Sequence, residues 1–192
     1  MDDIVRQAMA KWPQVPHCTG WLGLDARGNW YMRDDRAQAQ GGFASGLPGA
    51  KGSRLQHEKL IDFIGRNYAC ESTGAYAGQW FFQNGPQRVF VELEATPWVW
   101  RVDYAEGLFV VHSHTGLPAR PQRCALDEHG RLYLETELGF GLVHTQDMVL
   151  AADALEQGLW VAQSVLTREL PTRFAYVRSP HAQHASAMNA IK

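Results

Sequence analysis

The chain has 192 residues, of which 45% are apolar, 11% aromatic and 20% charged. This is the composition of an ordinary globular protein with material for a sizeable core, and the length suits one domain or two small units sharing a core. The net charge is −2 with acidic and basic residues interspersed, which argues against a surface for nucleic acid or for anionic membranes.

Neither a secretory signal nor a membrane span is expected. The start, MDDIVRQAMAKW, lacks a basic region followed by a long apolar run, and no window approaches the roughly 20 apolar residues of a membrane helix. Cys18, Cys70 and Cys124 are widely spaced and contain no CxxC pair, which is typical of reduced thiols. We therefore expect a soluble, cytoplasmic protein.

The N-terminal part predicts a helix, a strand pair and a loop. Residues 2–11 favour a short helix, which the prolines of WPQVPHC end. GWLGLDARGNWYMR is typical of two strands around a turn, where Gly28 supplies the permissive backbone. The following segment, 34–54, is rich in Gly, Ala and Ser, and predicts a mobile insertion.

A second helix is predicted directly after this insertion. Ser53 and Gln56 match a capping box, in which both side chains satisfy free backbone donors. Apolar residues then recur at helical spacing. The residues of this stripe are Leu60, Ile61, Ile64 and Tyr68.

The stretch FFQNGPQRVFVELEATPWVW, from 81 to 100, predicts a hairpin and a further strand. Asn84 begins an Asn-Gly pair, the strongest short turn signal. In the second strand the apolar residues Val89, Val91 and Leu93 share one face, which indicates one buried and one solvated face. The predicted solvated face carries Arg88, Phe90, Glu92 and Glu94. A surface salt-bridge network explains the three charged residues better than a glycosidase-like carboxylate pair.

The second half of the chain repeats this arrangement. LDARGNWYM (24–32) is echoed by LDEHGRLYL (126–134), and a helix, 145–157 in the second copy, follows both. Asp25 and Asp127 occupy equivalent places, which favours turn chemistry in which Asp bonds its own backbone ahead of Gly. We predict an α+β fold of two similar units, each with antiparallel β-strands packed on one helix.

The match extends beyond the second helix. GLWVAQS, which starts at Gly158, mirrors GQWFFQN, which starts at Gly78, and a closing strand at 173–179 is matched to the one that begins at Arg88. The number of residues between the first Leu of a copy and this Gly is larger in the first copy. The difference is about the length of the insertion 34–54, which we therefore place in the first copy.

The predicted organisation has four parts. An N-terminal helix and extended segment (1–19) precede a first unit (20–116) and a second unit (117–180). The tail, 181–192, is small, polar and without periodicity, so we expect it to be disordered.

The order of these motifs resembles a family of uncharacterised bacterial proteins, the domain-of-unknown-function family 1285, together with its close proteobacterial relatives. The resemblance is carried by D-x-x-G-x-W after the leading strand, HEKLIDFIGRNY, WFFQNGPQRVFVELEATPWVWRV, LDEHGRLYL, the DMVLAADAL helix and GLWVAQS, over roughly residues 20–180. It implies an α+β fold with repeated sheet-plus-helix motifs and a role in ligand sensing or signal transduction. It implies no catalytic residues.

Few residue clusters favour catalysis or metal binding. His112 and His114 alternate on a strand, so both imidazoles can meet one ion, but a zinc site needs at least a third ligand and none is near in sequence. A polar strand edge is the favoured interpretation. His17 and Cys18 are neighbours and therefore point to opposite faces of an extended chain, and free cysteines are more often small buried residues than nucleophiles.

The leading hypothesis is a non-enzymatic protein that binds a small apolar or aromatic ligand, or a protein partner, in a sensing or regulatory role. We predict no catalytic residue, metal or cofactor, and leave the oligomeric state open. Two alternatives are a hydrolase-type or metal-dependent enzyme using His112 or His114, and a structural protein-interaction module. The candidate ligand contacts, placed near the rim of a pocket between the repeats, are Asn84, Arg88, Trp98, Trp100, His112 and His114.

Overall fold

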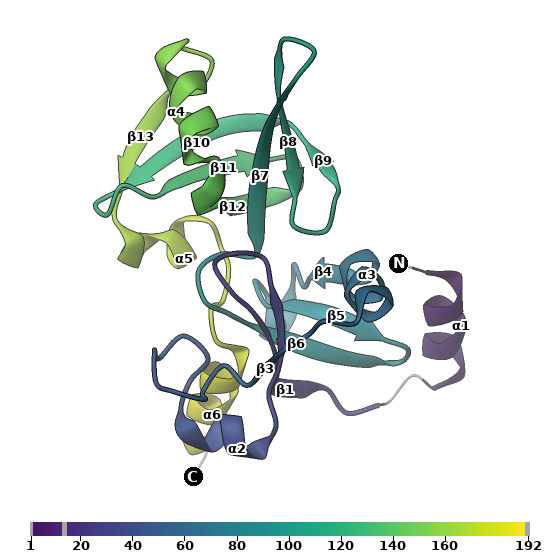
Figure 1. Ribbon diagram of the computed structural model, residues 1–192. Coiled ribbons are helices and arrows are strands. Elements are labelled where there is room, and N and C mark those ends of the chain that lie inside the picture. Colours follow the sequence, from purple (N-terminus) through teal and green to yellow (C-terminus); the bar gives the residue numbers. More distant parts are fainter. Residues whose placement is uncertain (1, 13–14, 191–192) are drawn as a thin grey trace. The chain divides into compact units, whose positions relative to one another are not determined.

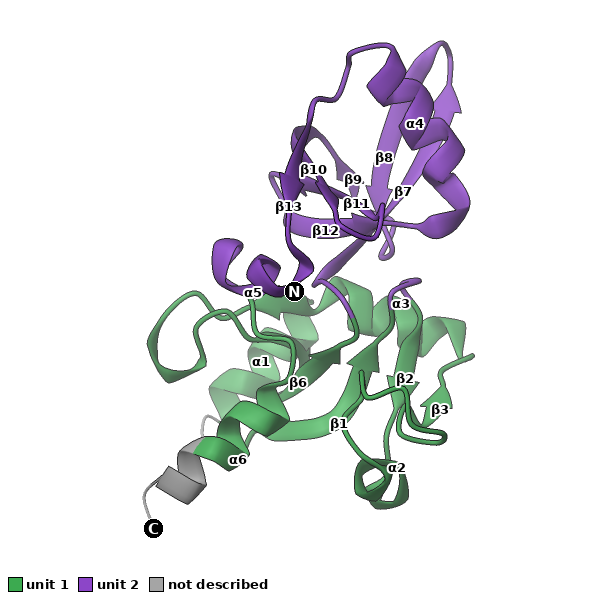
Figure 2. Ribbon diagram, turned by 90° about the vertical axis from the view of Figure 1, so that its left-hand side faces the viewer, with its two compact units in different colours: residues 1–25, 29–94, 176–192 green, residues 26–28, 95–175 purple. Residues whose placement is uncertain are grey.

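The chain forms two compact units, each built on its own β-sheet. The computed structural model describes residues 2–12 and 15–190 (Figure 1). The first unit comprises residues 1–25, 29–94 and 176–192, and the second comprises residues 26–28 and 95–175 (Figure 2). The division therefore falls at residue 95 and not at the predicted 116–117, because the β-hairpin that follows residue 95 pairs with the second sheet.

The first unit contains a six-stranded sheet in the order β3-β2-β1-β6-β5-β4. β1 pairs antiparallel with β2 and parallel with β6, so the sheet is mixed. The elements of this unit are α1 (Asp3–Lys11), β1 (Cys18–Leu24), β2 (Trp30–Met32), α2 (Asp35–Gln40), β3 (Ser53–Arg54), α3 (Glu58–Arg66), β4 (Tyr68–Cys70), η1 (Gly74–Tyr76), β5 (Trp80–Asn84), β6 (Gln87–Leu93) and α6 (Pro180–Ala190).

Helices cover both faces of this sheet. Phe81 lies opposite Phe90 in the β5–β6 hairpin, so these two rings share one face, and Phe82 lies on the other. The ring of Phe63 on α3 contacts Phe82 at 5.4 Å, whereas His184 on α6 contacts Phe90 at 5.8 Å between ring centroids. The sheet is therefore packed between α3 and α6.

The helix α3 starts later than its predicted capping box. Ser53 lies on the short strand β3, and the N-cap is His57, whose Nδ1 accepts a hydrogen bond from the backbone N–H of Leu60 at 3.2 Å. Tyr68 lies beyond the helix, on β4. The prediction was wrong here because β3 pairs with β2, which fixes Ser53 in extended backbone.

The face of β6 that was predicted to be solvated is covered. Glu92 is 2% exposed, and its carboxylate accepts hydrogen bonds from the hydroxyl of Ser179 at 2.6 Å and the backbone N–H of His181 at 3.0 Å. A carboxylate is stabilised at this position by the free N–H groups of the first turn of a helix. The helix α6 spans Pro180–Ala190, so the predicted disorder of 181–192 is wrong for residues 181–190, and residues 191–192 lie outside the described part.

The predicted network of Arg88, Glu92 and Glu94 is also wrong. Arg88 pairs with Glu71 at 2.6 Å, and Glu94 pairs with Lys51 at 2.7 Å. Glu92 accepts its hydrogen bonds at the start of α6. Each of the three charged side chains therefore has a partner from a different part of the chain.

The segment 34–54 folds around a buried arginine. Arg33 is 2% exposed, and its guanidinium donates hydrogen bonds to the carbonyl oxygens of Gly20 at 3.1 Å, Gly41 at 2.6 Å and Ala50 at 2.8 Å. The predicted mobile insertion thus contains α2, β3 and carbonyl groups drawn inward by one side chain. Five N–H donors on a rigid plane suit such a role.

The second unit contains a seven-stranded sheet in the order β13-β10-β11-β12-β7-β8-β9. Its elements are β7 (Trp98–Ala105), β8 (Leu108–Ser113), β9 (Pro118–Ala119), β10 (Pro121–Asp127), β11 (Leu132–Thr136), β12 (Gly139–Val143), η2 (Thr145–Asp147), α4 (Met148–Glu156), β13 (Ala162–Val165), η3 (Thr167–Glu169) and α5 (Leu170–Arg173). Only Arg120 separates β9, at one edge, from β10, which lies next to the other edge. The sheet must therefore curl strongly, as Figure 1 shows.

The two units share a core motif. In each, an antiparallel hairpin (β1–β2 or β10–β11) continues into a third strand, a helix follows, and a later strand returns parallel to the first (β6 or β13). The predicted α+β fold of two similar units is confirmed. The predicted alignment of GLWVAQS with GQWFFQN is displaced, because β13 corresponds to β6 and not to β5. The predicted closing strand at 173–179 is absent, because α5 and a turn occupy those residues.

We expect the turn glycines of the two hairpins to differ in their tolerance of alanine. Gly28 and Gly130 have φ angles of 80° and 73°, which cost a non-glycine residue about 1 kcal/mol. At Gly28 a Cβ would also lie 2.6 Å from the Cβ of His114, whereas no atom lies within 4 Å at Gly130. Gly28→Ala is expected to lower the free energy of unfolding by about 2–3 kcal/mol and Gly130→Ala by about 1 kcal/mol. Urea denaturation measures both, and equal losses would contradict the steric argument.

Replacing Arg33 tests whether it holds the segment 34–54. We expect Arg33→Met to lower the free energy of unfolding by about 3 kcal/mol, because several buried carbonyl groups lose a charged donor. Arg36→Met, at an exposed position of α2, is the control and should change stability by less than about 0.5 kcal/mol. Hydrogen exchange should accelerate within 34–54 in the first variant only, and unchanged exchange there would refute this role.

Candidate functional site

The six predicted ligand contacts divide between the two units. Asn84 and Arg88 lie on β5 and β6 of the first unit, and the two tryptophans and two histidines lie in the second. Asn84 is exposed at the hairpin turn, paired with Gln87. The guanidinium of Arg88 lies 4.7 Å from the centroid of the Phe81 ring, and its hydrogen bond to Glu71 lowers the pKa of that carboxyl.

The tryptophans of β7 belong to the core of the second unit. Trp98 and Trp100 are 4% and 0% exposed, and their rings stack with centroids 5.8 Å apart. Their indole N–H groups donate to the carbonyl oxygens of Leu138 at 2.8 Å and Leu134 at 2.9 Å. They therefore use their polar atoms inside the fold.

The two histidines have different surroundings. His114 packs its ring 5.6 Å from that of Trp98, and its Nδ1 accepts a hydrogen bond from the backbone N–H of Val99 at 3.3 Å. His112 lies on β8 with its Nδ1 3.4 Å from a carboxylate oxygen of Asp103. Among the described residues, no group of three or more His, Cys, Asp or Glu side chains is arranged to hold a metal ion.

The cysteines are held as thiols. Burial raises the pKa of Cys70 to about 11 and that of Cys124 to about 11, and it also raises the pKa of Cys18. Because the thiolate is the reactive form, none of the three is activated as a nucleophile near neutral pH.

Asp25 and Asp127 perform the predicted turn chemistry. Asp25 accepts hydrogen bonds from the backbone and side-chain N–H groups of Asn29 at 2.8 and 2.9 Å. Asp127 accepts from the backbone N–H of Arg131 at 2.9 Å, from its Nε at 2.7 Å and from the hydroxyl of Tyr133 at 2.8 Å. Burial raises the pKa of Asp127, but hydrogen bonds from Arg131, Tyr133 and the backbone outweigh it, so the pKa lies well below its usual range.

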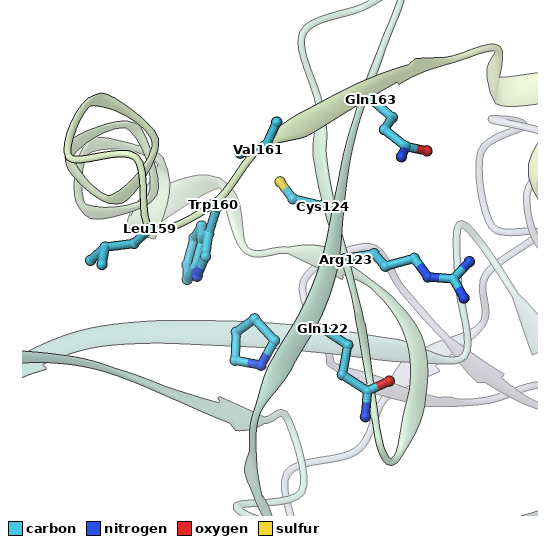
Figure 3. Close-up of a pocket in the computed structure, with 8 residues that line it drawn as sticks. Gln122, Arg123, Cys124, Leu159, Trp160, Val161 and Gln163 are labelled. Carbon is cyan, nitrogen blue, oxygen red and sulfur yellow. The ribbon is translucent and has the colours of Figure 1, made fainter.

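A cavity of about 290 Å³ opens in the second unit where β13 diverges from β10 (Figure 3). The sulfur of Cys124 and the ring of Trp160 lie on the same side of β10, and Leu159 and Val161 flank the ring (Figure 3). The lining residues are Pro121, Gln122, Arg123, Cys124, Leu159, Trp160, Val161 and Gln163.

A second, wider cavity of about 700 Å³ adjoins the first. It is lined by residues 108–111, 118–122 and Glu137, and shares Pro121 and Gln122 with the first. The rings of Phe109 and Trp160, one from each cavity, have centroids 6.4 Å apart. We call the combined surface, formed by residues 108–111, 118–124 and 159–163, the apolar groove.

The apolar groove exposes aliphatic side chains that most folded proteins bury. Leu108, Leu159 and Val161 are 67%, 60% and 79% exposed. The sequence did not predict this surface because its three segments, 108–111, 118–124 and 159–163, lie far apart in the chain. None of them by itself indicates that its apolar side chains are exposed. The one local signal was Leu159-Trp160-Val161, an apolar run directly after a glycine.

The chain belongs to the family whose model, DUF2944, is described as "Protein of unknown function (DUF2946)" and matches residues 1–181. No curated protein matches the chain. Among solved structures it is similar to that of a DUF1285 family protein from Silicibacter pomeroyi DSS-3, with 13% sequence identity, a TM-score of 0.47, and coverage of 80% of this chain and 84% of that chain. The prediction that the chain belongs to a family of uncharacterised proteins is confirmed by the family model. None of the helices in the described part of the chain has the length and apolar character to cross a membrane.

The lowered pKa of Asp127 predicts a pH dependence of stability. A carboxyl whose pKa is lower in the folded state stabilises the fold above its unfolded-state pKa of about 4, and this contribution is lost as the pH falls towards the folded-state pKa. We expect Asp127→Asn to be less stable by about 2 kcal/mol at neutral pH, with the difference narrowing from about pH 5 downwards. Urea denaturation across pH measures this, with the exposed Asp153→Asn as control. A difference independent of pH would contradict the assignment.

Proposed function

We propose that this member of the family is a non-catalytic binding protein, which takes an apolar ligand or partner in the apolar groove and acts in sensing or regulation in the cytoplasm. The observation that carries the proposal is the coincidence, in one groove, of a cavity with several exposed aliphatic side chains and an aromatic ring. Such a surface is stabilised when an apolar partner removes it from water.

The chemistry of the groove favours binding over catalysis. The titratable side chains that line its two cavities are Arg120, Arg123, Cys124 and Glu137, of which Cys124 is a thiol near neutral pH. General acid–base or nucleophilic catalysis requires a group whose pKa is matched to its task and a partner that orients it. The groove instead presents hydrocarbon, amide groups, two cations and, at its rim, a carboxylate that accepts a hydrogen bond from the backbone N–H of Arg120.

The size of the exposed side chains sets the expected strength of binding. Burying one aliphatic side chain fully contributes about 1.5–3 kcal/mol, so three contribute roughly 5 kcal/mol or more before the cost of association. Once the cost of association is subtracted, these three side chains support weak, reversible binding with dissociation constants of roughly millimolar or above.

Binding of a fluorescent apolar dye, anilinonaphthalene sulfonate, tests this proposal. We expect Val161→Ser to weaken dye binding roughly fivefold, because about 1 kcal/mol of apolar contact is lost. Val149→Ser is the matched control, since Val149 is 74% exposed but lies on α4 outside the groove. Fluorescence titration of the full chain gives both constants, and equal values for the two variants would exclude the groove as the binding surface.

A further inference from the structure

One part of the groove is the incompletely paired edge of β8. On its inner side β8 pairs with β7 along its whole length, from Leu108 to Ser113. On its outer side it pairs with β9 only at Val111 and His112, and the N–H of Ser113 bonds to Leu117. Backbone groups alternate between the two sides of a strand, so after Ser113 and Val111 the next outward-facing residue is Phe109. The register therefore directs the N–H and C=O groups of Phe109 into the groove.

This edge lacks the features by which sheet edges are normally protected. Residues 108–111 read Leu-Phe-Val-Val, without a charge or a proline, whereas β9 carries Pro118 and β3 consists of Ser53 and Arg54. An apolar strand edge with free backbone groups recruits another strand. The backbone thus favours a partner in extended conformation, since an extended segment in line with β9 can pair with both the N–H and the C=O of Phe109.

The side chains around the edge specify apolar residues in that partner. Leu108 and Val110 point to one face of β8 and are 67% and 42% exposed. Phe109 points to the other face of β8, where its ring lies 6.4 Å from that of Trp160. A strand added at this edge therefore meets apolar side chains with both of its alternate sets of residues, Leu108 and Val110 on one face and Phe109 and Trp160 on the other.

One exposed cation of the groove favours an acidic residue in the partner. Of the two arginines in the groove, Arg123 lies 3.6 Å from a carboxylate oxygen of Glu135. Glu137 lines the rim, but its carboxylate accepts a hydrogen bond from the backbone N–H of Arg120 at 2.9 Å. The exposed side chain of Arg120 is therefore placed to meet a carboxylate of the bound segment.

We propose that the apolar groove binds an extended, apolar and acidic segment of a partner protein, which adds as an antiparallel strand to β8 in line with β9 and places a carboxylate near Arg120. This inference rests on the proposed function and deepens it, because it names the class of partner. The segment satisfies the backbone groups of Phe109 and completes the edge that β9 covers only in part.

The test uses the full chain and a panel of fluorescent peptides of the pattern Val-Thr-Val-Glu-Val-Thr-Val, in which the apolar residues are varied. Fluorescence anisotropy measures their affinities, together with those of analogues in which Lys replaces Glu or alternate backbone nitrogens are methylated. We expect members of the panel to bind, the Lys analogue to bind at least fivefold more weakly, and methylation of one of the two alternate sets to weaken binding at least tenfold. Hydrogen exchange of the Phe109 amide should slow in the complex.

Protein variants separate the charge contribution from general effects. Arg120→Ala should reduce the preference for Glu over Lys, whereas Arg168→Ala, at an exposed position on η3 outside the groove, should leave it unchanged. The proposal is overturned if no member of the panel binds, if methylated and unmethylated peptides bind equally, or if sedimentation shows that a second copy of the chain occupies the groove. If no peptide binds but Val161→Ser still weakens dye binding, strand addition alone is wrong. If Val161→Ser does not weaken dye binding, the proposed function is wrong as well.

Discussion

The motif that the two units share depends on a buried aspartate at the end of its first strand, β1 or β10. Asp25 and Asp127 each bond the backbone N–H four residues ahead, and the strand backbone closes the same turn in return. Tyrosines six residues ahead, Tyr31 and Tyr133, bond the same carboxylates. This turn holds the hairpin on one edge of the first strand, which leaves its other edge for the parallel strand, β6 or β13.

The parts of the fold that the sequence predicts are those set by neighbouring residues. The turn at Gly28, the hairpin at Asn84 and the paired aspartate motifs are all local, and all occur as predicted. The Ser179 hydroxyl that binds Glu92 lies 87 residues away in the chain, so the burial of Glu92 depends on the packing of α6. The carbonyl groups that bind Arg33 lie up to 17 residues away, so its burial depends on the segment 34–54. Alternation along β6 predicted a buried and a solvated face, but α6 covers the second.

The same distinction explains the candidate site. The sequence predicts Trp98 and Trp100 as ligand contacts, yet both indole N–H groups bond to carbonyl oxygens within the second unit. The apolar groove, by contrast, combines three segments, 108–111, 118–124 and 159–163, that meet only through the curl of the sheet. Apart from the run Leu159-Trp160-Val161, no local pattern distinguishes its exposed valines and leucines from those of the core.

The buried tryptophans and the open edge of β8 belong to the same sheet. A Cβ at Gly141 on β12 would lie 2.5 Å from the indole nitrogen of Trp100 and 2.7 Å from the Cβ of Trp98. The two rings therefore fit only because residue 141, on the strand next to β7, has no side chain. The rings thus occupy space over β12 that a side chain fills in an ordinary strand. At the edge of the same sheet, β9 has two residues and is joined to β10 through Arg120 alone. Because β9 pairs with β8 only at Val111 and His112, it leaves Phe109 at an open edge. The sheet that buries the tryptophans of β7 thus offers its binding surface on the neighbouring strand, β8.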